Sequence, residues 1–265
     1  MENFQNITKF LLTLSKKAAE ITLRHYSAGG IEAEIKGDMS PVTKADTEVN
    51  SMVISEVRKS YPDYGVMGEE ESTEINGSKK FFVVDPIDGT LMFKIGCPLF
   101  VFSAAIVVYG ESVAGILSNP LAKRTLLAEK NKGAYLVEEN KRIHVSSKNS
   151  LEGALVNAGW KKTALSKLLH ERGAKTPQVF AVCEVASLIA TGGFEGGTYN
   201  GMHAHDMAAT KIVIEEAGGK VTDLEGNEQK YDQKINGAVM SNGLLHEEIV
   251  KLAKEAGLKI ETYNQ

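Results

Sequence analysis

The stretch Phe81-Phe82-Val83-Val84-Asp85-Pro86-Ile87-Asp88-Gly89-Thr90 joins an apolar run to a turn that carries two acids. The run at 81–84 is typical of a buried strand. Because Pro86 lacks an N–H and fixes its own φ, we expect the strand to end at Asp85 and a helical turn to follow over 86–90. In such a turn Asp85 and Asp88 are three positions apart, so their carboxylates face one point.

Two carboxylates at the end of a buried strand repel each other unless a cation lies between them. Oxygen ligands of this kind suit Mg²⁺ or Mn²⁺ better than Zn²⁺. Gly89 leaves the N–H groups of the turn open to an anion, so the stretch predicts a site for a metal and a phosphate together. The same residue types are also common in ordinary tight turns, so the rest of the chain is needed to choose between the two interpretations.

The 265 residues have the composition of an ordinary globular protein, with 43% hydrophobic and 24% charged side chains. The formal net charge is −4 and no basic block stands out, which argues against nucleic acids and anionic membranes as partners. We find neither a signal peptide nor an apolar run long enough to span a bilayer. Cys97 and Cys183 lie in apolar surroundings and are expected to be reduced, so we expect a cytoplasmic protein.

Hydrophobic periodicity divides the chain into two parts. Before residue 148, amphipathic helices are expected at 4–27 and 43–60, and a short strand at 64–67. A largely antiparallel meander is expected at 81–84, 99–108, 112–117, 124–128 and 134–137. Later, strands at 154–157, 178–182, 220–222 and 238–241 alternate with helices at 161–171, 184–191, 206–217 and 244–256. We expect one compact unit in which an α+β half, 1–148, carries the main metal-binding motifs and an α/β half, 149–265, completes the site.

Two further acidic segments are candidates to complete the site. Glu69 and Glu70 follow Gly68 in a turn that ends a predicted strand, and a glutamate placed there could share an ion with Asp85. Asp206 begins a predicted helix, where an acid is commonly only a cap. Its approach, the glycine- and histidine-bearing loop 201–205, is unusual for a cap and favours a functional role. A transition-metal cluster of His203, His205 and Asp206 is the alternative interpretation.

Two more polar residues have a functional and a structural interpretation. The Thr90 hydroxyl could orient a water molecule or bond within its own turn. Asp46 lies near the start of the second predicted helix, where it could be catalytic, although the helix dipole favours an acid there in any case.

Three motifs resemble those of the inositol monophosphatase family of Mg²⁺-dependent, lithium-sensitive phosphatases. They are Gly68-Glu69-Glu70, the stretch 85–90 followed by Phe93, and Asp206-Met207-Ala208-Ala209 followed by Glu216-Ala217-Gly218-Gly219. Weaker similarities occur at 41–46 and 190–193. The resemblance covers nearly the whole chain. It implies an α/β fold, the αβαβα sandwich of the inositol monophosphatase and fructose bisphosphatase type, and typically a homodimer.

The resemblance also implies a role for each motif residue. Glu69, Asp85 and the carbonyl of Ile87 would hold a first Mg²⁺. Asp85, Asp88 and Asp206 would hold a second, and Glu69 would serve a weaker third ion through water, with Mn²⁺ as a substitute. Thr90 with Asp46 would orient and help to deprotonate the attacking water. The N–H groups of Gly89 and Thr90 would bind the phosphate. Glu70 would not bind a metal itself but would act on the residues that do.

The substrate-recognising part departs from the family pattern. His205 stands where a Trp usually precedes the last aspartate, and Tyr199 stands where inositol phosphatases place an acid on an inositol hydroxyl. The segment 180–182, Phe-Ala-Val, replaces a Gly-Ser/Thr-Ala segment that often contacts substrate. The residues expected to contact substrate are Asp88, Gly89, Thr90, Phe180, Tyr199 and His205.

The predicted function is hydrolysis of inositol monophosphate or a related sugar phosphate by metal-activated water. Fructose bisphosphatase and bisphosphate nucleotidase activities are the alternatives within the phosphatase class. A non-catalytic sensor of phosphorylated metabolites is the alternative outside it. The presence of Thr90 and Asp46 argues against a sensor, because binding alone does not need water activation.

Overall fold

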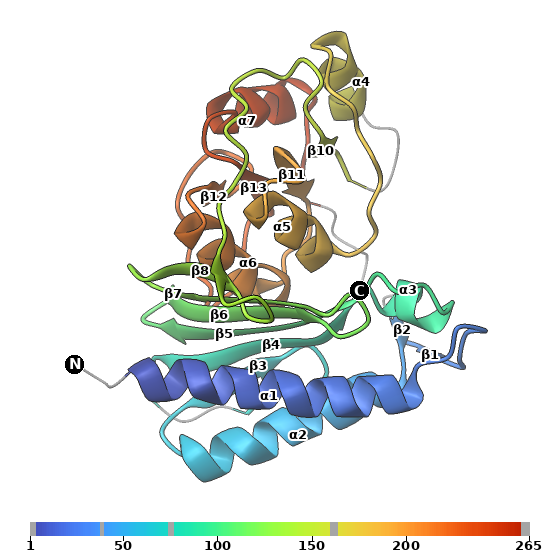
Figure 1. Ribbon diagram of the computed structural model, residues 1–265, viewed down its shortest axis with the longest axis vertical. Helices are drawn as coiled ribbons and strands as arrows, with labels where there is room; N and C mark the ends of the chain where they lie inside the picture. The colour runs from blue at the N-terminus through green and yellow to red at the C-terminus, as the bar shows by residue number, and fades with distance from the viewer. Residues whose placement is uncertain (1–3, 38–39, 74–76, 160–163, 261–265) are drawn as a thin grey trace.

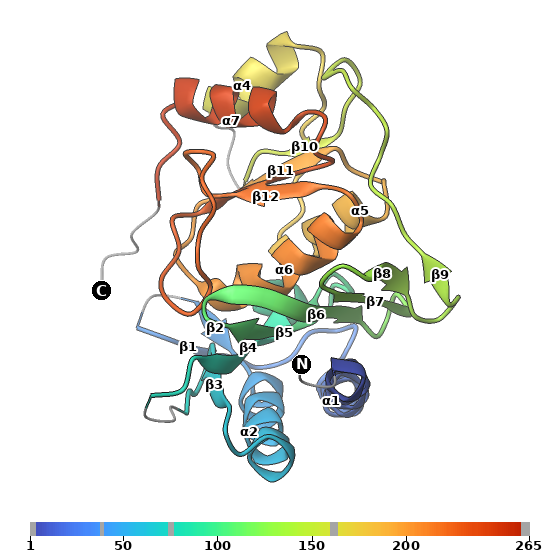
Figure 2. The ribbon, with the colours of Figure 1, turned by 90° about the vertical axis from the view of Figure 1, so that its left-hand side faces the viewer.

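The structure, a computed structural model, describes residues 4–37, 40–73, 77–159 and 164–260. It consists of five layers (Figures 1 and 2). Helices α1 (Phe4–His25) and α2 (Lys44–Ser60) form the first layer, and a seven-stranded sheet forms the second. Helices α5 (Val182–Ala190) and α6 (Ala204–Glu216) lie between this sheet and a four-stranded one, which α4 (Ala164–Glu171) and α7 (His246–Glu255) cover. The predicted αβαβα sandwich is confirmed.

The large sheet is a meander in which the strands follow one another in chain order. The first pair is parallel and every later pair is antiparallel, as the close spacing of the predicted strands required. The strands are β3 (Gly65–Gly68), β4 (Lys80–Asp88), β5 (Val101–Val108), β6 (Glu111–Asn119), β7 (Arg124–Glu129), β8 (Gly133–Leu136) and β9 (Lys141–Arg142). A short helix, α3 (Thr90–Lys94), follows β4, and the small hairpin of β1 (Glu34–Ile35) and β2 (Pro41–Val42) lies beside it.

The small sheet has the strand order β10-β11-β13-β12. Its first pair is parallel and the other two are antiparallel. The strands are β10 (Val156–Asn157), β11 (Gly196–Tyr199), β12 (Lys220–Thr222) and β13 (Ala238–Ser241). Helix α6 contacts both sheets, so the two predicted halves pack together through it. A division of the chain at residue 148 stays a prediction.

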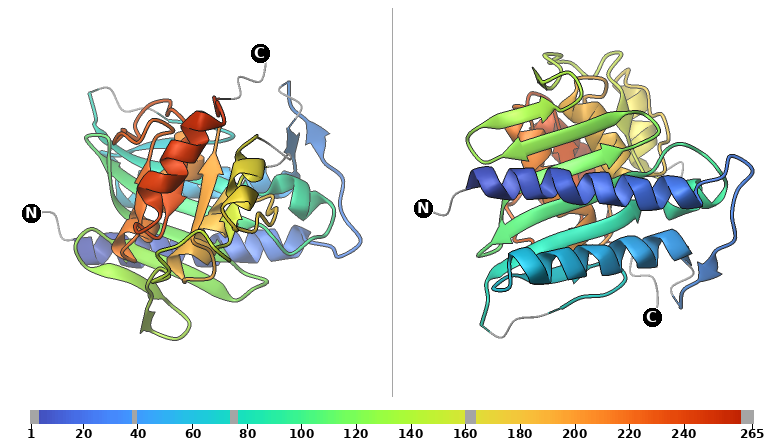
Figure 3. Two further views of the ribbon diagram at one scale, coloured as in Figure 1. Left: turned by 90° about the horizontal axis from the view of Figure 1, so that it is seen from above. Right: turned by 60° about the horizontal axis from the view of Figure 1, so that its bottom comes forward.

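Side chains of the large sheet alternate between two cores, as the period of a strand requires. Phe82 and Val84 of β4 join the core under α1 and α2, which cross one face of the sheet side by side (Figure 3). Val83 joins the core under α5 and α6. Burial of each large apolar side chain contributes about 1.5–3 kcal/mol, so both faces of the sheet hold the layers together. None of the helices in the described residues is long and apolar enough to cross a bilayer.

The structure corrects the prediction that the strand ends at Asp85. Strand β4 continues through Pro86 to Asp88, and the predicted helical turn over 86–90 is absent, because helix α3 begins only at Thr90. Pro86 is tolerated because the ladder between β4 and β5 is interrupted there, so a missing N–H costs no hydrogen bond.

Other elements also differ from the prediction. Residues 178–181 are irregular chain and α5 begins at Val182, so the strand predicted at 178–182 is wrong. The sequence analysis does not predict four of the strands, namely β1, β2, β9 and β11. The first three have only two residues each, too few to show a pattern, and the glycines of β11 have a low propensity for strands. The predicted helix at 161–171 is present from Ala164 onward, and its first three residues lie outside the described residues.

Candidate metal and phosphate site

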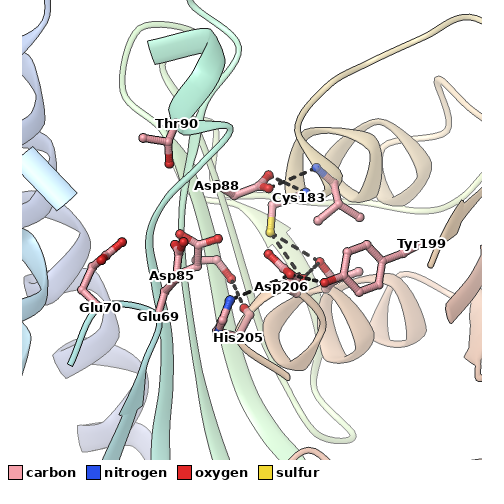
Figure 4. A network of polar contacts seen from close by, with 12 residues as sticks. Glu69, Glu70, Asp85, Asp88, Thr90, Cys183, Tyr199, His205 and Asp206 are labelled. Atoms are coloured by element: carbon pink, nitrogen blue, oxygen red, sulfur yellow. Dashed lines mark hydrogen bonds and ion pairs between the residues drawn. The ribbon is translucent and has the colours of Figure 1, made fainter. Parts of the chain in front are cut away.

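The predicted acids come from separate elements and meet at one end of the large sheet (Figure 4). Asp85 and Asp88 belong to β4, and Asp206 lies in the first turn of α6. One carboxylate oxygen from each of the three lies within 4.8 Å of the others. This group contains no histidine, so the alternative cluster of His203, His205 and Asp206 is not the one that forms among the described residues.

A β-bulge brings Asp85 and Asp88 to the same side of the strand. Asp85 pairs with Ser103 and Asp88 with Val101, so three steps along β4 match two along β5. In a regular strand, residues at i and i+3 point to opposite faces. The extra residue shifts the alternation by one position, and both carboxylates then point toward α6. The predicted convergence of the two acids is therefore confirmed, although a bulge and not a helical turn produces it.

Asp85 and Asp88 are almost completely buried, with 2% and 7% of their surface exposed. The N–H of Ile87 donates to Asp85 at 2.9 Å, and the N–H groups of Val182 and Cys183 donate to Asp88 at 3.2 and 2.7 Å. Burial, followed by the charges of neighbouring carboxylates, raises the pKa of both aspartates well above the ordinary value. A buried set of carboxylates that is deficient in positive charge fits a hard divalent cation such as Mg²⁺ or Mn²⁺.

Glu69 and Glu70 lie in the turn that follows β3. The N–H of Glu69 donates to the Val84 carbonyl at 3.1 Å, which fixes the turn to β4, and Glu69 lies beside Asp85 (Figure 4). The side-chain amide of Asn50 donates to the carbonyl of Glu71 at 3.0 Å and ties the same turn to α2. Glu69 is thus brought to the aspartates, whereas Glu70 lies farther from them.

Lys36 is a residue of this site that the sequence did not reveal. Its ammonium lies 2.9 Å from Glu69 Oε1 and 2.6 Å from Glu70 Oε1. Burial alone would lower the pKa of Lys36, but the charge of Glu69 and the hydrogen bonds to both glutamates outweigh burial and raise it. Lys36 therefore carries a full positive charge between the two acids. In the sequence it is one of many lysines in polar connections, and no local pattern marks it.

Asp46 and Thr90 meet beside the acidic cluster. Thr90 Oγ1 lies 3.2 Å from Asp46 Oδ1 and 3.0 Å from the carbonyl oxygen of Ile87. Asp46 is fully buried, and its Oδ2 accepts hydrogen bonds from the N–H and the hydroxyl of Thr43. Burial raises the pKa of Asp46 to about 6, although the bonds from Thr43 oppose that shift.

Gly89 separates β4 from α3 in a conformation with φ of +89°, which favours glycine. A Cβ at this position would lie 2.8 Å from the Leu99 carbonyl oxygen and 2.9 Å from the Ala181 methyl carbon. The turn therefore fits closely against the start of α5, and only a glycine leaves room for it.

The predicted substrate-contacting residues are only partly brought together. The Tyr199 hydroxyl donates a hydrogen bond to Asp206 (Figure 4), and His205 Nε2 lies 3.9 Å from Asp206 Oδ2. The rings of His203 and His205 stack with centroids 5.0 Å apart. Phe180 is half-buried in the irregular chain before α5. A contact of Phe180, Tyr199 or His205 with substrate stays a prediction.

The fold and the acidic cluster together define a class of protein, a layered α/β enzyme whose site fits divalent cations. The family model described as "Inositol monophosphatase family" matches residues 3–258, and the chain belongs to this family. It is therefore a phosphatase of a metal-dependent family that acts on small phosphate substrates, as the motifs predicted.

Individual relatives agree with this assignment over almost their full lengths. A fructose-1,6-bisphosphatase/inositol-1-monophosphatase of Thermotoga maritima is 31% identical, with 93% of this chain and 95% of the relative covered. A histidinol-phosphatase of Mycobacterium tuberculosis is 31% identical, with 90% and 94% covered. The solved structure of a Thermotoga maritima inositol monophosphatase has a TM-score of 0.86 at 30% identity, with 95% and 98% covered.

Proposed function

We propose that this protein is a Mg²⁺-dependent phosphomonoesterase whose substrate is inositol monophosphate or a related sugar phosphate. The observation that carries the proposal is the meeting of Asp85, Asp88 and Asp206 within 4.8 Å. Mg²⁺ is commonly bound by carboxylates together with the phosphate oxygens of a substrate, and these aspartates supply carboxylates for such a site.

The residues proposed to hold two or three ions are Glu69, Asp85, the Ile87 carbonyl, Asp88 and Asp206. When bound, the ions supply positive charge for the phosphate and lower the pKa of a bound water toward neutrality. Glu70 is proposed to support the ligands, and the Lys36 ammonium, which bonds to Glu69 and Glu70 together, neutralises them while no cation is bound. The N–H groups of Gly89 and Thr90 are proposed to bind the phosphate.

Thr90 and Asp46 are proposed to handle the proton of the attacking water. When Thr90 donates its hydroxyl proton to Asp46 Oδ1, its own oxygen is free to accept a proton from water. A carboxylate whose pKa is raised to about 6 suits a proton acceptor near neutral pH. The chain's own groups can therefore orient the water and remove its proton.

A fructose bisphosphatase activity is the second candidate, because one of the relatives named above carries both activities in its name. A phosphate-release panel separates the candidates. It should contain inositol 1-phosphate, fructose 1,6-bisphosphate, histidinol phosphate and adenosine 3′,5′-bisphosphate, each with Mg²⁺ and with EDTA. We expect Mg²⁺-dependent release, greatest with inositol 1-phosphate.

The matched variants for this panel are Asp85→Asn and Asp63→Asn. Asp85→Asn should nearly abolish release, whereas Asp63→Asn, at an exposed acid in the turn before β3, should leave it unchanged. Normal Mg²⁺-dependent release by Asp85→Asn would falsify the assignment of the metal site. Inhibition by Li⁺, a homodimer and a cytoplasmic location are further proposals from the family resemblance, and a Li⁺ titration and light scattering test the first two.

A further inference from the structure

Tyr199 is the last residue of β11, and its phenol turns back toward the start of α6. The hydroxyl donates a hydrogen bond to Oδ2 of Asp206 (Figure 4). The phenol carries one O–H, and this carboxylate oxygen is the acceptor that it meets.

The loop between Tyr199 and α6 has a space reserved for this phenol. A Cβ on Gly201 would lie 2.1 Å from the Tyr199 hydroxyl oxygen and 2.4 Å from the ring carbon that bears it. The three atoms nearest to that Cβ all belong to Tyr199. Gly201 does not have a positive φ, so the requirement for glycine here is one of space and not of backbone conformation.

Contacts to Asp206 are concentrated on one of its oxygens. The Tyr199 hydroxyl bonds to Oδ2, and His205 Nε2 lies 3.9 Å from the same atom. Neither contact involves Oδ1. A donor that fixes one oxygen of a carboxylate sets the rotation of the whole group, and so the direction of the other oxygen.

We propose that Tyr199 is a positioning residue for the metal site, because its hydroxyl holds the Asp206 carboxylate in the orientation that meets Asp85 and Asp88. This inference rests on the proposed function, since it requires that the three aspartates bind divalent cations. It assigns the Tyr199 hydroxyl to a metal ligand and not to the alcohol part of the substrate. Hydrogen-bond partners of metal ligands typically change metal affinity by about 10–100-fold when removed.

Calorimetric titration with Mn²⁺ of the full chain tests the proposal. Tyr199→Phe keeps the ring and removes only the donor, so Mn²⁺ should bind about 10–100-fold more weakly. The loss of turnover should become smaller as the Mn²⁺ concentration rises toward saturation, because the ligand itself remains. A merely structural role would instead lower the melting temperature and kcat at every metal concentration.

Gly201→Ala provides a second variant that retains the phenol but displaces it. It should weaken Mn²⁺ binding as Tyr199→Phe does, and the double variant should be no weaker than the single ones, because they remove the same interaction. Tyr231→Phe is the matched control. Tyr231 is also buried. Its N–H donates to the carbonyl of Gly110, which follows β5, whereas Asp85 pairs near the start of that strand. Tyr231 is therefore remote from the site, and the Mn²⁺ affinity of Tyr231→Phe should not change.

The outcomes separate this inference from the proposed function. A wild-type protein that takes up no Mn²⁺, or takes up as much as Asp206→Asn, overturns the proposed function and the inference with it. If wild type binds Mn²⁺ but Tyr199→Phe binds equally or more tightly, only the role of Tyr199 is overturned. If Tyr199→Phe does not fold, Gly201→Ala decides, and wild-type affinity in that variant refutes the inference.

Discussion

Thr90 and Asp46 are 44 positions apart in the sequence, and Thr90 Oγ1 lies 3.2 Å from Asp46 Oδ1. The same hydroxyl lies 3.0 Å from the Ile87 carbonyl oxygen, so its single proton can be donated to either acceptor. Thr43 holds the other oxygen of Asp46 through its N–H and its hydroxyl, at 2.8 and 2.5 Å. This capping interaction at the start of α2 fixes the carboxylate that faces Thr90.

Replacement of Thr90 by Val should remove proton handling while keeping the β-branched shape. We expect kcat to fall by about 10²–10⁴-fold, the usual range for proton transfer by a positioned side chain. Thr90→Ser retains the hydroxyl and should stay within about tenfold of wild type. Steady-state phosphate release at saturating Mg²⁺ distinguishes the two. Equal activity of the Val and Ser variants would show that the hydroxyl has no part in the reaction.

Asp85→Asn should make the metal-free protein more stable while removing its response to metal. Asp85 is buried among like charges from Glu69, Asp206 and Asp88, and the amide carbonyl can still accept the N–H of Ile87. Relief of this repulsion should contribute about 1–3 kcal/mol to the free energy of unfolding. Thermal melts in EDTA and in Mg²⁺ provide the measurement. A large Mg²⁺-dependent rise in melting temperature for the variant would contradict the prediction.

Lys36→Gln should have the opposite effect on the metal-free protein. Removal of the ammonium leaves Glu69 and Glu70 without their shared partner, which should cost about 1–3 kcal/mol of stability in EDTA. Because a cation at Glu69 would no longer compete with the ammonium, Mg²⁺ should raise the melting temperature more than in wild type. Lys16→Gln, at an exposed position of α1, is the control and should match wild type in both buffers. Destabilisation that Mg²⁺ does not reverse would argue against this competition.

The acidic residues of the site could be predicted from sequence because their signals are local. Asp85 and Asp88 follow an apolar run, and Asp206 opens a helix after an unusual loop. The route by which the first two converge could not be predicted, since a proline after a strand is typical of a turn as well as of a bulge. Pairing with β5 decides between them, and pairing is a property of the folded sheet.

The contacts of Lys36, and those of the chain at the start of α5, could not be predicted from the sequence because they join residues that are far apart along the chain. Lys36 meets Glu69 and Glu70 across more than 30 residues, and the polar connection around it has no periodicity. Residues 178–182 have good strand propensity, but the N–H groups of Val182 and Cys183 bond to Asp88 instead of to a neighbouring strand. A distant carboxylate thus overrides the local preference.

His246 should make the stability of the protein depend on pH through the small sheet. The ring is buried between two hydroxyls, with Nε2 2.9 Å from Thr222 Oγ1 and Nδ1 2.9 Å from Ser241 Oγ. The Thr222 hydroxyl can donate to the Asp223 carbonyl and Ser241 Oγ accepts the N–H of Gly243, so a neutral ring with its proton on Nε2 satisfies every group. A second ring proton, on Nδ1, would take away the atom that accepts the Ser241 hydroxyl proton.

Burial, and then the charge of Lys220, lowers the pKa of His246 from 6.5 to about 4. The unfolded chain therefore takes up a proton at a higher pH than the folded chain does. The contribution of the neutral ring to the free energy of unfolding is fully present above pH 6.5. It is lost as the pH falls toward 4 and amounts to about 1–3 kcal/mol in total. Urea unfolding should show that, between pH 7.5 and 4.5, the free energy of unfolding of His246→Asn falls by about 1–3 kcal/mol less than that of wild type. His144→Gln, at an exposed position, is the control and should show the wild-type dependence of the free energy of unfolding on pH. The same dependence in His246→Asn would show that the His246 ring does not cause it.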